Sequence, residues 1–234
     1  MTTQDRAITL RDWEVRAVLN GATQIRRVVK PQPLACNEYA FLKDDLLEHA
    51  PYQPGQRLWV REKWRIGAWD IERECLAVDY PDGYCRKEWL QVPSNGRYGV
   101  FEQWDSRFAL YLDQCLDDCD NANISANANG NFKWEPGQSP CRWRPSIFMP
   151  RWASRITLEV TSTGAGRVQE MTDDESDATC FYGDFPHKLF PHLFDDSGSL
   201  SMVECFGVVW DADNPKYSWR DNPWNWVYGV RRVE

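Results

Sequence analysis

The segment WRPSIFMPRWASRITLEV, residues 143–160, carries two patterns side by side. Its last residues, 155–160, alternate polar and apolar side chains, which is typical of a strand with one buried face. The residues before them, 143–154, contain no acidic side chain and interleave arginines with aromatic rings. The segment therefore predicts a core strand that directly follows a basic, aromatic stretch.

Outward from this segment, the sequence predicts the other elements of a small α+β fold. Helices are predicted over residues 10–20, 40–49 and 173–182. The last of these opens with a capping box, in which Thr172 and Glu175 satisfy each other's backbone amides. Extended segments are predicted over residues 23–30, 57–62 and 226–233. Few strands, far apart in sequence and separated by helices, favour a small mixed β-barrel with flanking helices over a parallel βαβ sheet.

We expect one domain over residues 1–234. Its core segments are about 8–66, 143–182 and 222–234. Residues 67–142 and 183–221 are expected to be irregular insertions, because turn residues interrupt their short strand-like pieces, such as Cys75 to Tyr80. The first insertion includes the low-complexity run NANISANANGN at residues 121–131.

The N-terminal sequence MTTQDRAITL has no basic region followed by an apolar core, and no window approaches eighteen apolar residues. We therefore expect a cytoplasmic protein that does not enter a membrane, with its eight cysteines reduced. No CxxC pair occurs, and we expect neither a metal nor a cofactor. Cys115, Cys119 and Cys141 are the candidates for zinc, but they lack an evident fourth ligand.

Two stretches without acidic residues stand out in a chain with a formal net charge of −8: residues 15–37 and 141–158. Arginine forks suit phosphate oxygens, and indole rings stack on unpaired bases for about 1–3 kcal/mol each. The candidate nucleic-acid contacts are Arg16, Arg26, Arg27, Arg61, Lys63, Trp64, Arg144, Arg151, Trp152 and Arg155. In the alternative reading, these arginines pair with the acidic runs at residues 113–120 and 170–177.

Four segments, in their order, resemble phage- or prophage-encoded ASCH-domain proteins. They are ITLRDWEVRAVLNGATQIRRVVKPQP (8–33), PGQRLWVREKW (54–64), the segment at 143–160 with the capped helix after it, and NPWNWVYGVRRV (222–233). The resemblance implies a PUA-like β-barrel, placed in the cytoplasm of a bacterial host. It also implies a cleft, between the first helix and the strands, for RNA or a modified base.

Some members of this family hydrolyse an acetylated nucleoside, using a Gly-x-Lys-Thr-x-Thr-x-Arg run and a glutamate in the later helix. The corresponding run here is NGATQIRR, residues 20–27. The family's lysine, second threonine and glutamate correspond to Ala22, Ile25 and Thr179, although Glu175 or Asp177 takes the last place if the register shifts. The resemblance implies that this hydrolysis is lost, while Arg26 keeps the place of the motif's arginine.

Three functions stay open at this point. The first is binding of RNA, single-stranded nucleic acid or a modified nucleotide. The second is binding and inhibition of a host defence protein, through the acidic residues 113–120 and the aromatic residues 181–194.

The third function is an enzyme acting on a nucleoside or on RNA, for which Glu62, Lys63 and Glu175 are the fallback acid–base groups beside Arg26. No phosphate loop, HExxH or GxSxG motif occurs, so we assign no catalytic residue. The histidines, at positions 49, 187 and 192, are expected on the surface or in loops.

Overall fold

The computed structural model describes residues 5–33, 39–70, 75–82, 86–91, 106–128, 130–179 and 201–233. The chain forms two compact units. The first unit comprises Met1–Ala7, Trp13–Trp59 and Ile156–Glu234, and the second comprises Ile8–Asp12 and Val60–Arg155. The predicted insertion at 67–142 lies wholly within the second unit.

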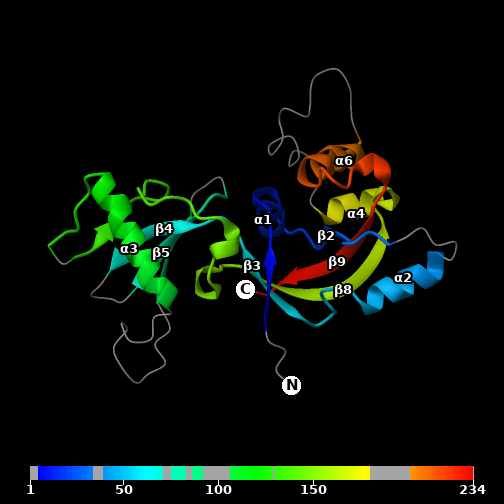
Figure 1. The fold of residues 1–234 in the computed structure, drawn as a ribbon, viewed down its shortest axis with the longest axis horizontal. Coiled ribbons are helices and arrows are strands. Elements are labelled where there is room, and N and C mark those ends of the chain that lie inside the picture. The colour runs from blue at the N-terminus through cyan, green and yellow to red at the C-terminus, as the bar shows by residue number, and fades with distance from the viewer. Residues whose placement is uncertain are drawn as a thin grey trace, which may run out of the picture. The chain divides into compact units, whose positions relative to one another are not determined.

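The first unit is built on a sheet with the strand order β1-β3-β8-β9-β2. Its strands are β1 (Arg6–Thr9), β2 (Gln24–Val28), β3 (Arg57–Arg61), β8 (Thr157–Arg167) and β9 (Trp224–Arg232). Along the chain, β1 and β3 continue into the second unit at Ile8 and Val60. The long antiparallel pair of β8 and β9 dominates it (Figure 1). At the bulge in β8, a side chain at Gly229 would collide with the Ser162 hydroxyl, so glycine allows the two strands to approach. The predicted strands at 57–62, 155–160 and 226–233 are confirmed.

The helices of this unit are α1 (Asp12–Leu19), α2 (Tyr39–Glu48), α4 (Asp173–Ala178) and α6 (Met202–Asp213). Gly21 follows α1 with φ +101°, a conformation that ends a helix at little cost for glycine. The capping box of Thr172 and Glu175 is confirmed at the start of α4.

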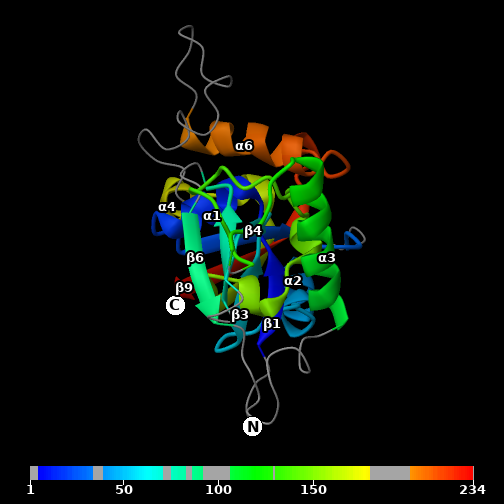
Figure 2. The same ribbon diagram turned by 90° about the vertical axis from the view of Figure 1, so that its left-hand side faces the viewer.

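Helix α6 corrects the expectation of irregular structure over residues 183–221. It starts with a second capping box, formed by Ser201 and Glu204. It lies beside α4 (Figure 1, Figure 2), and its buried face includes Phe206 and Trp210. Gly207 approaches the Trp219 ring so closely that an added Cβ would be 3.0 Å from it. Residues 180–200, with His187, His192 and most of the aromatic run at 181–194, lie outside the described residues.

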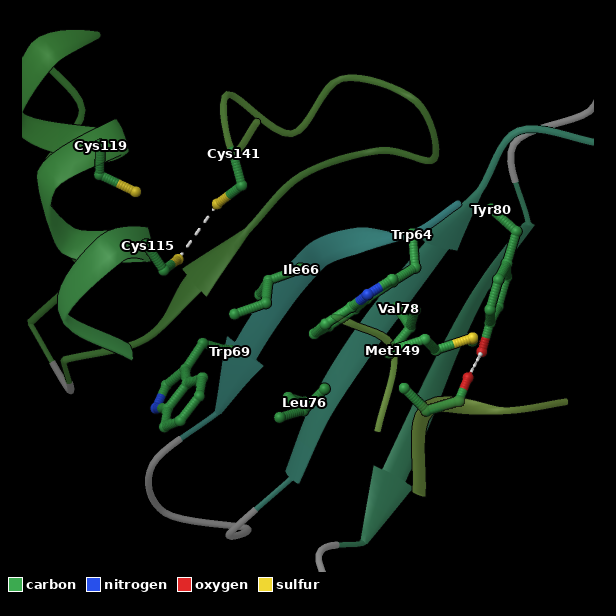
Figure 3. Packing of buried hydrophobic residues seen from close by; sticks show 11 residues of the cluster. Trp64, Ile66, Trp69, Leu76, Val78, Tyr80, Cys115, Cys119, Cys141 and Met149 are labelled. Carbon is green, nitrogen blue, oxygen red and sulfur yellow. Dashed lines mark hydrogen bonds between the residues drawn. The ribbon is translucent and has the colours of Figure 1, made fainter. Parts of the chain in front are cut away.

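The second unit has its own sheet, with the order β6-β5-β4-β7, and one long helix. These elements are β4 (Arg65–Asp70), β5 (Cys75–Tyr80), β6 (Arg86–Gln91), β7 (Phe132–Lys133) and α3 (Ser106–Asn121). Buried side chains from β4 and β5 form a core with three cysteines (Figure 3). Strand β5 confirms the strand-like piece expected at Cys75 to Tyr80. For the other elements the expectation of an irregular insertion is wrong, although residues 122–128 do form a loop.

The fold class is α+β, as predicted, with helices and two mainly antiparallel sheets. Over the described ranges, neither sheet closes into a barrel. Among the same residues, no helix combines the length and the apolar character needed to cross a bilayer.

Candidate nucleic-acid interface

The candidate contacts are divided between the two units. Arg16, Arg26 and Arg27 belong to the first unit. The remaining candidates belong to the second.

Arg26 is a buried cation on β2, with only 3% of its side chain exposed. Its Nη2 lies 2.9 Å from the Oε2 of Glu175 on α4. Its Nε donates to the Gln24 side chain, and its Nη1 donates to Oδ1 of Asn225 on β9. Burial lowers the pKa of Arg26, and the nearby carboxylate of Glu175 only partly offsets this. Because the guanidinium is enclosed by these groups, we do not retain Arg26 as a contact for phosphate.

Arg27, the next residue, makes a forked ion pair with Glu14 on α1. Its Nη1 bonds one carboxylate oxygen, and its Nη2 lies 3.1 Å from the other. Glu14 is buried, so the pair ties α1 to β2. Arg16, also on α1, is partly buried.

The positions that the resemblance assigns to the lysine, second threonine and glutamate of the hydrolase motif hold buried residues. Ala22 and Ile25 are buried and apolar. Thr179 is buried as well, and its hydroxyl donates to the Ser176 carbonyl over 2.7 Å. The acid that faces the motif's arginine is Glu175, whose Oε2 also accepts the amide of Thr172 at the helix cap. The fallback acid Glu175 therefore has two structural partners already.

In the second unit, Arg155 lies between two carboxylates. Its Nε and Nη2 donate to the two oxygens of Glu62 over 2.9 and 2.8 Å, and its Nη1 donates to Asp82 over 2.6 Å. Its guanidinium also covers the Tyr80 ring, 4.1 Å from the centroid. Only 2% of the Arg155 side chain is exposed, so this residue too is not retained as a phosphate contact.

Arg155, Glu62 and Asp82 form a triad of one cation and two anions, and this composition sets their pKa values. Burial alone would lower the pKa of Arg155, but the hydrogen bonds and charges of Glu62 and Asp82 raise it overall. Burial raises the pKa of Glu62, Arg155 offsets this only in part, and the negative charge of Asp82 raises this pKa further. Glu62 therefore has a structural partner, and its fallback role as an acid–base group has no support in this geometry.

Trp64 and Arg144 are interior residues of the second unit. Trp64 has no exposed surface, so its ring cannot stack on a base. The two residues pair through both backbone amides, and the Arg144 guanidinium lies 5.8 Å from the Trp64 ring centroid. Arg144 also donates to the Gln114 side chain on α3. Trp152 is partly buried, edge-on to Trp64.

A different set of side chains reaches the surface, and we call it the basic aromatic surface. It comprises Arg61, Lys63, Trp143, Phe148 and Arg151. Lys63 and Arg151 are exposed, and Phe148 is 60% exposed. Arg61 donates to the carbonyl of Ile147, and the Lys63 ammonium lies 5.7 Å from the Trp143 ring centroid. These two contacts link the end of β3 to the segment 143–151.

Phe148 and Ile147, which is 65% exposed, were not among the site residues chosen from the sequence. They lie at a 3₁₀ turn over Ser146–Phe148, between Pro145 and Pro150. The signal that could have identified them is two bulky apolar residues in a proline-bounded turn, where a short turn cannot bury both.

The other residues singled out in the sequence lie partly in the core and partly at the surface. Cys115, Cys119 and Cys141 come together in the core of the second unit. Asp118, within the acidic run at 113–120, pairs with Arg142. His49 is exposed, as expected.

Comparisons with protein-family models, with curated proteins and with solved structures found no match to this chain.

Proposed function

We propose that the protein binds single-stranded nucleic acid, as RNA or DNA, through the basic aromatic surface of its second unit. The observation that carries the proposal is the exposure of Phe148 in a segment that also holds the exposed Arg151 and that contacts the exposed Lys63 through the Trp143 ring. An exposed ring stacks on an unpaired base for about 1–3 kcal/mol, and the cations attract the phosphates beside it.

A single strand fits this surface better than a duplex does. The bases of a duplex are stacked inside it, out of reach of a phenyl ring on a short turn. An unpaired base, or a modified base of one nucleotide, offers a free face to Phe148 while its phosphate approaches Arg151. Because the net charge of the chain is −8, attraction must come from such a local concentration of cations.

The proposal extends to the ASCH-like, PUA-like family and to a phage or prophage origin, with the protein in the host cytoplasm. The family assignment rests on the sequence segments that resemble it, which form α1, β2, β3, β8, α4 and β9 in that order along the chain. We propose that amide hydrolysis is absent, because the lysine position holds buried Ala22 and the acid Glu175 pairs with Arg26.

The test is fluorescence anisotropy with a labelled oligouridine RNA and with oligothymidine DNA. We expect the double variant Lys63→Ala/Arg151→Ala to bind at least about tenfold more weakly, as expected for two lost phosphate contacts. Lys216→Ala/Arg220→Ala is the matched control, since it removes two exposed cations from the first unit. Equal losses in both double variants would reduce the effect to net charge and refute the assigned surface.

A second candidate function is binding of a host protein, and one observation favours it. Asp113, Asp117 and Asp120 are exposed along α3. A row of carboxylates suits a partner with a basic surface, such as a nuclease of the host. Its test is the charge-reversed variant Asp113→Lys/Asp117→Lys in a pull-down from host lysate treated with nuclease. Loss of a stoichiometric partner would support this function, and an unchanged set of captured proteins would refute it.

A further inference from the structure

Three cysteine side chains of the second unit converge on one point. Cys115 and Cys119 are four residues apart on α3, so they lie on the same face of that helix. Cys141 approaches from the segment that follows Pro140. The three sulfur atoms all lie within 4.8 Å of one another, and each residue is 1% exposed (Figure 3).

The arrangement differs from a disulfide. The Sγ atoms of Cys115 and Cys141 are 3.1 Å apart, whereas a disulfide requires about 2.05 Å. The sulfur of Cys119 lies at the same place. A disulfide between Cys115 and Cys141 would leave this third sulfur without a role. A single buried thiol acts as a small apolar side chain, but three converging thiols offer a set of soft donor atoms.

The segment that carries Cys141 is fixed on both sides of the cysteine. Before it, the Ser139 hydroxyl donates to the Ile66 carbonyl over 2.6 Å and accepts the Cys141 amide. After it, the Arg142 amide donates to Asp118 on α3 over 3.0 Å, and the Arg142 guanidinium pairs with the same carboxylate. These bonds hold Cys141 opposite the two helical cysteines, and such supporting contacts are typical of metal sites.

We propose that Cys115, Cys119 and Cys141 bind one thiophilic d¹⁰ metal ion that ties α3 to the segment carrying Cys141. Thiolate ligands select ions of this class, which includes Zn²⁺ and Cu⁺. Cu⁺ accepts three sulfur ligands as they stand, whereas Zn²⁺ takes a small fourth ligand from solution. The ion enters without a change of oxidation state, and each coordinating thiol releases its proton to solvent. This inference is independent of the proposed nucleic-acid binding.

The experiment uses the full-length chain, reduced, desalted and titrated under nitrogen with Zn²⁺ or with Cu⁺ against a chromophoric chelator. We expect one equivalent to bind, with ultraviolet sulfur-to-metal charge transfer in the Cu⁺ titration and in a parallel Cd²⁺ titration, and a higher melting temperature. The ion for which the protein competes more strongly against the chelator is the one assigned to the site. No uptake of either ion, or a Cys115–Cys141 disulfide in the protein isolated without reductant, would overturn the proposal.

Substitutions then assign the ligands. We expect Cys115→Ser, Cys119→Ser and Cys141→Ser each to weaken metal binding by more than about tenfold, the lower range found for lost supporting contacts alone. Cys205→Ser is the matched control, because Cys205 is an equally buried free thiol in the first unit. If a serine variant fails to fold, Asp118→Asn keeps all three thiols, and we expect it to bind metal several times more weakly. Full metal binding in the Cys115, Cys119, Cys141 and Asp118 variants would refute the site.

Discussion

The two units each bury an arginine, and the surroundings of the two guanidinium groups differ. Arg155 in the second unit faces Glu62 and Asp82, whose side chains are only 3% and 11% exposed. Arg26 in the first unit forms an ion pair with Glu175, whose side chain is 35% exposed. When its cation is removed, an anion that can turn to water destabilises the folded protein only slightly. An enclosed anion left without its cation destabilises the folded protein strongly. We therefore expect Arg155 to contribute more to the free energy of unfolding than Arg26 does.

The largest effect is expected for Arg155→Met, which keeps much of the side-chain volume but leaves two enclosed carboxylates without their cation. We expect a loss of about 3–5 kcal/mol in the free energy of unfolding, measured by urea denaturation. Replacing Glu62, Asp82 and Arg155 together by apolar residues should restore most of this loss. A loss below about 1 kcal/mol for Arg155→Met would show that the triad is not enclosed.

Arg26→Met is the matched substitution in the first unit. We expect a smaller loss of about 1–2 kcal/mol, because Glu175 can reach solvent while Asn225 loses one hydrogen-bond donor. The measurement is the same denaturation experiment. A loss as large as that of Arg155→Met would remove the distinction between the two arginines.

The pH dependence of stability sharpens the description of the triad. The pKa of Glu62 in the folded protein is raised by burial above its unfolded value of about 4.3. The favourable contribution of Glu62 to the free energy of unfolding is therefore complete below the unfolded pKa. It is lost as the pH rises through the folded pKa. We expect the wild-type protein to lose stability relative to Glu62→Gln between about pH 4 and neutrality. A difference that stays constant, or grows in favour of wild type, would contradict the direction of this shift.

The smallest effect on stability is expected at the exposed ring. Phe148→Ala should change the free energy of unfolding by no more than about 0.5 kcal/mol, because the side chain is mostly in water. The same variant should lose about 1–3 kcal/mol of affinity for oligouridine, measured by anisotropy. A clear loss of stability with unchanged affinity would mean that Phe148 serves the fold.

Local signals in the sequence predicted several elements well. The capping box of Thr172 and Glu175 and the alternation at 155–160 each depend on neighbouring residues, and both appear in the structure. Strand β4 gave no such signal, because Arg65 to Trp69 are all buried and so do not alternate. Helix α6 was missed for a related reason, since buried residues cover much of its circumference.

The partners of the arginines could be predicted only in part. Arg142 and Arg26 do pair with the acidic runs at 113–120 and 170–177, as the alternative reading held. Arg155 instead pairs with Glu62, which is 93 residues away in sequence, and that choice depends on the tertiary fold. For the same reason, the sequence could not separate enclosed arginines from those that stay exposed.

The proposed function assigns the nucleic-acid contacts to exposed cations of the second unit and not to the enclosed arginines. The most direct measurement is the dependence of oligouridine affinity on salt concentration. For Lys63→Ala/Arg151→Ala, the slope of log affinity against log salt should become shallower by about 0.7 for each lost phosphate contact. For Arg26→Met, the slope should stay at the wild-type value. An unchanged slope in the double variant, or a shallower one in Arg26→Met, would exclude this assignment of the contacts.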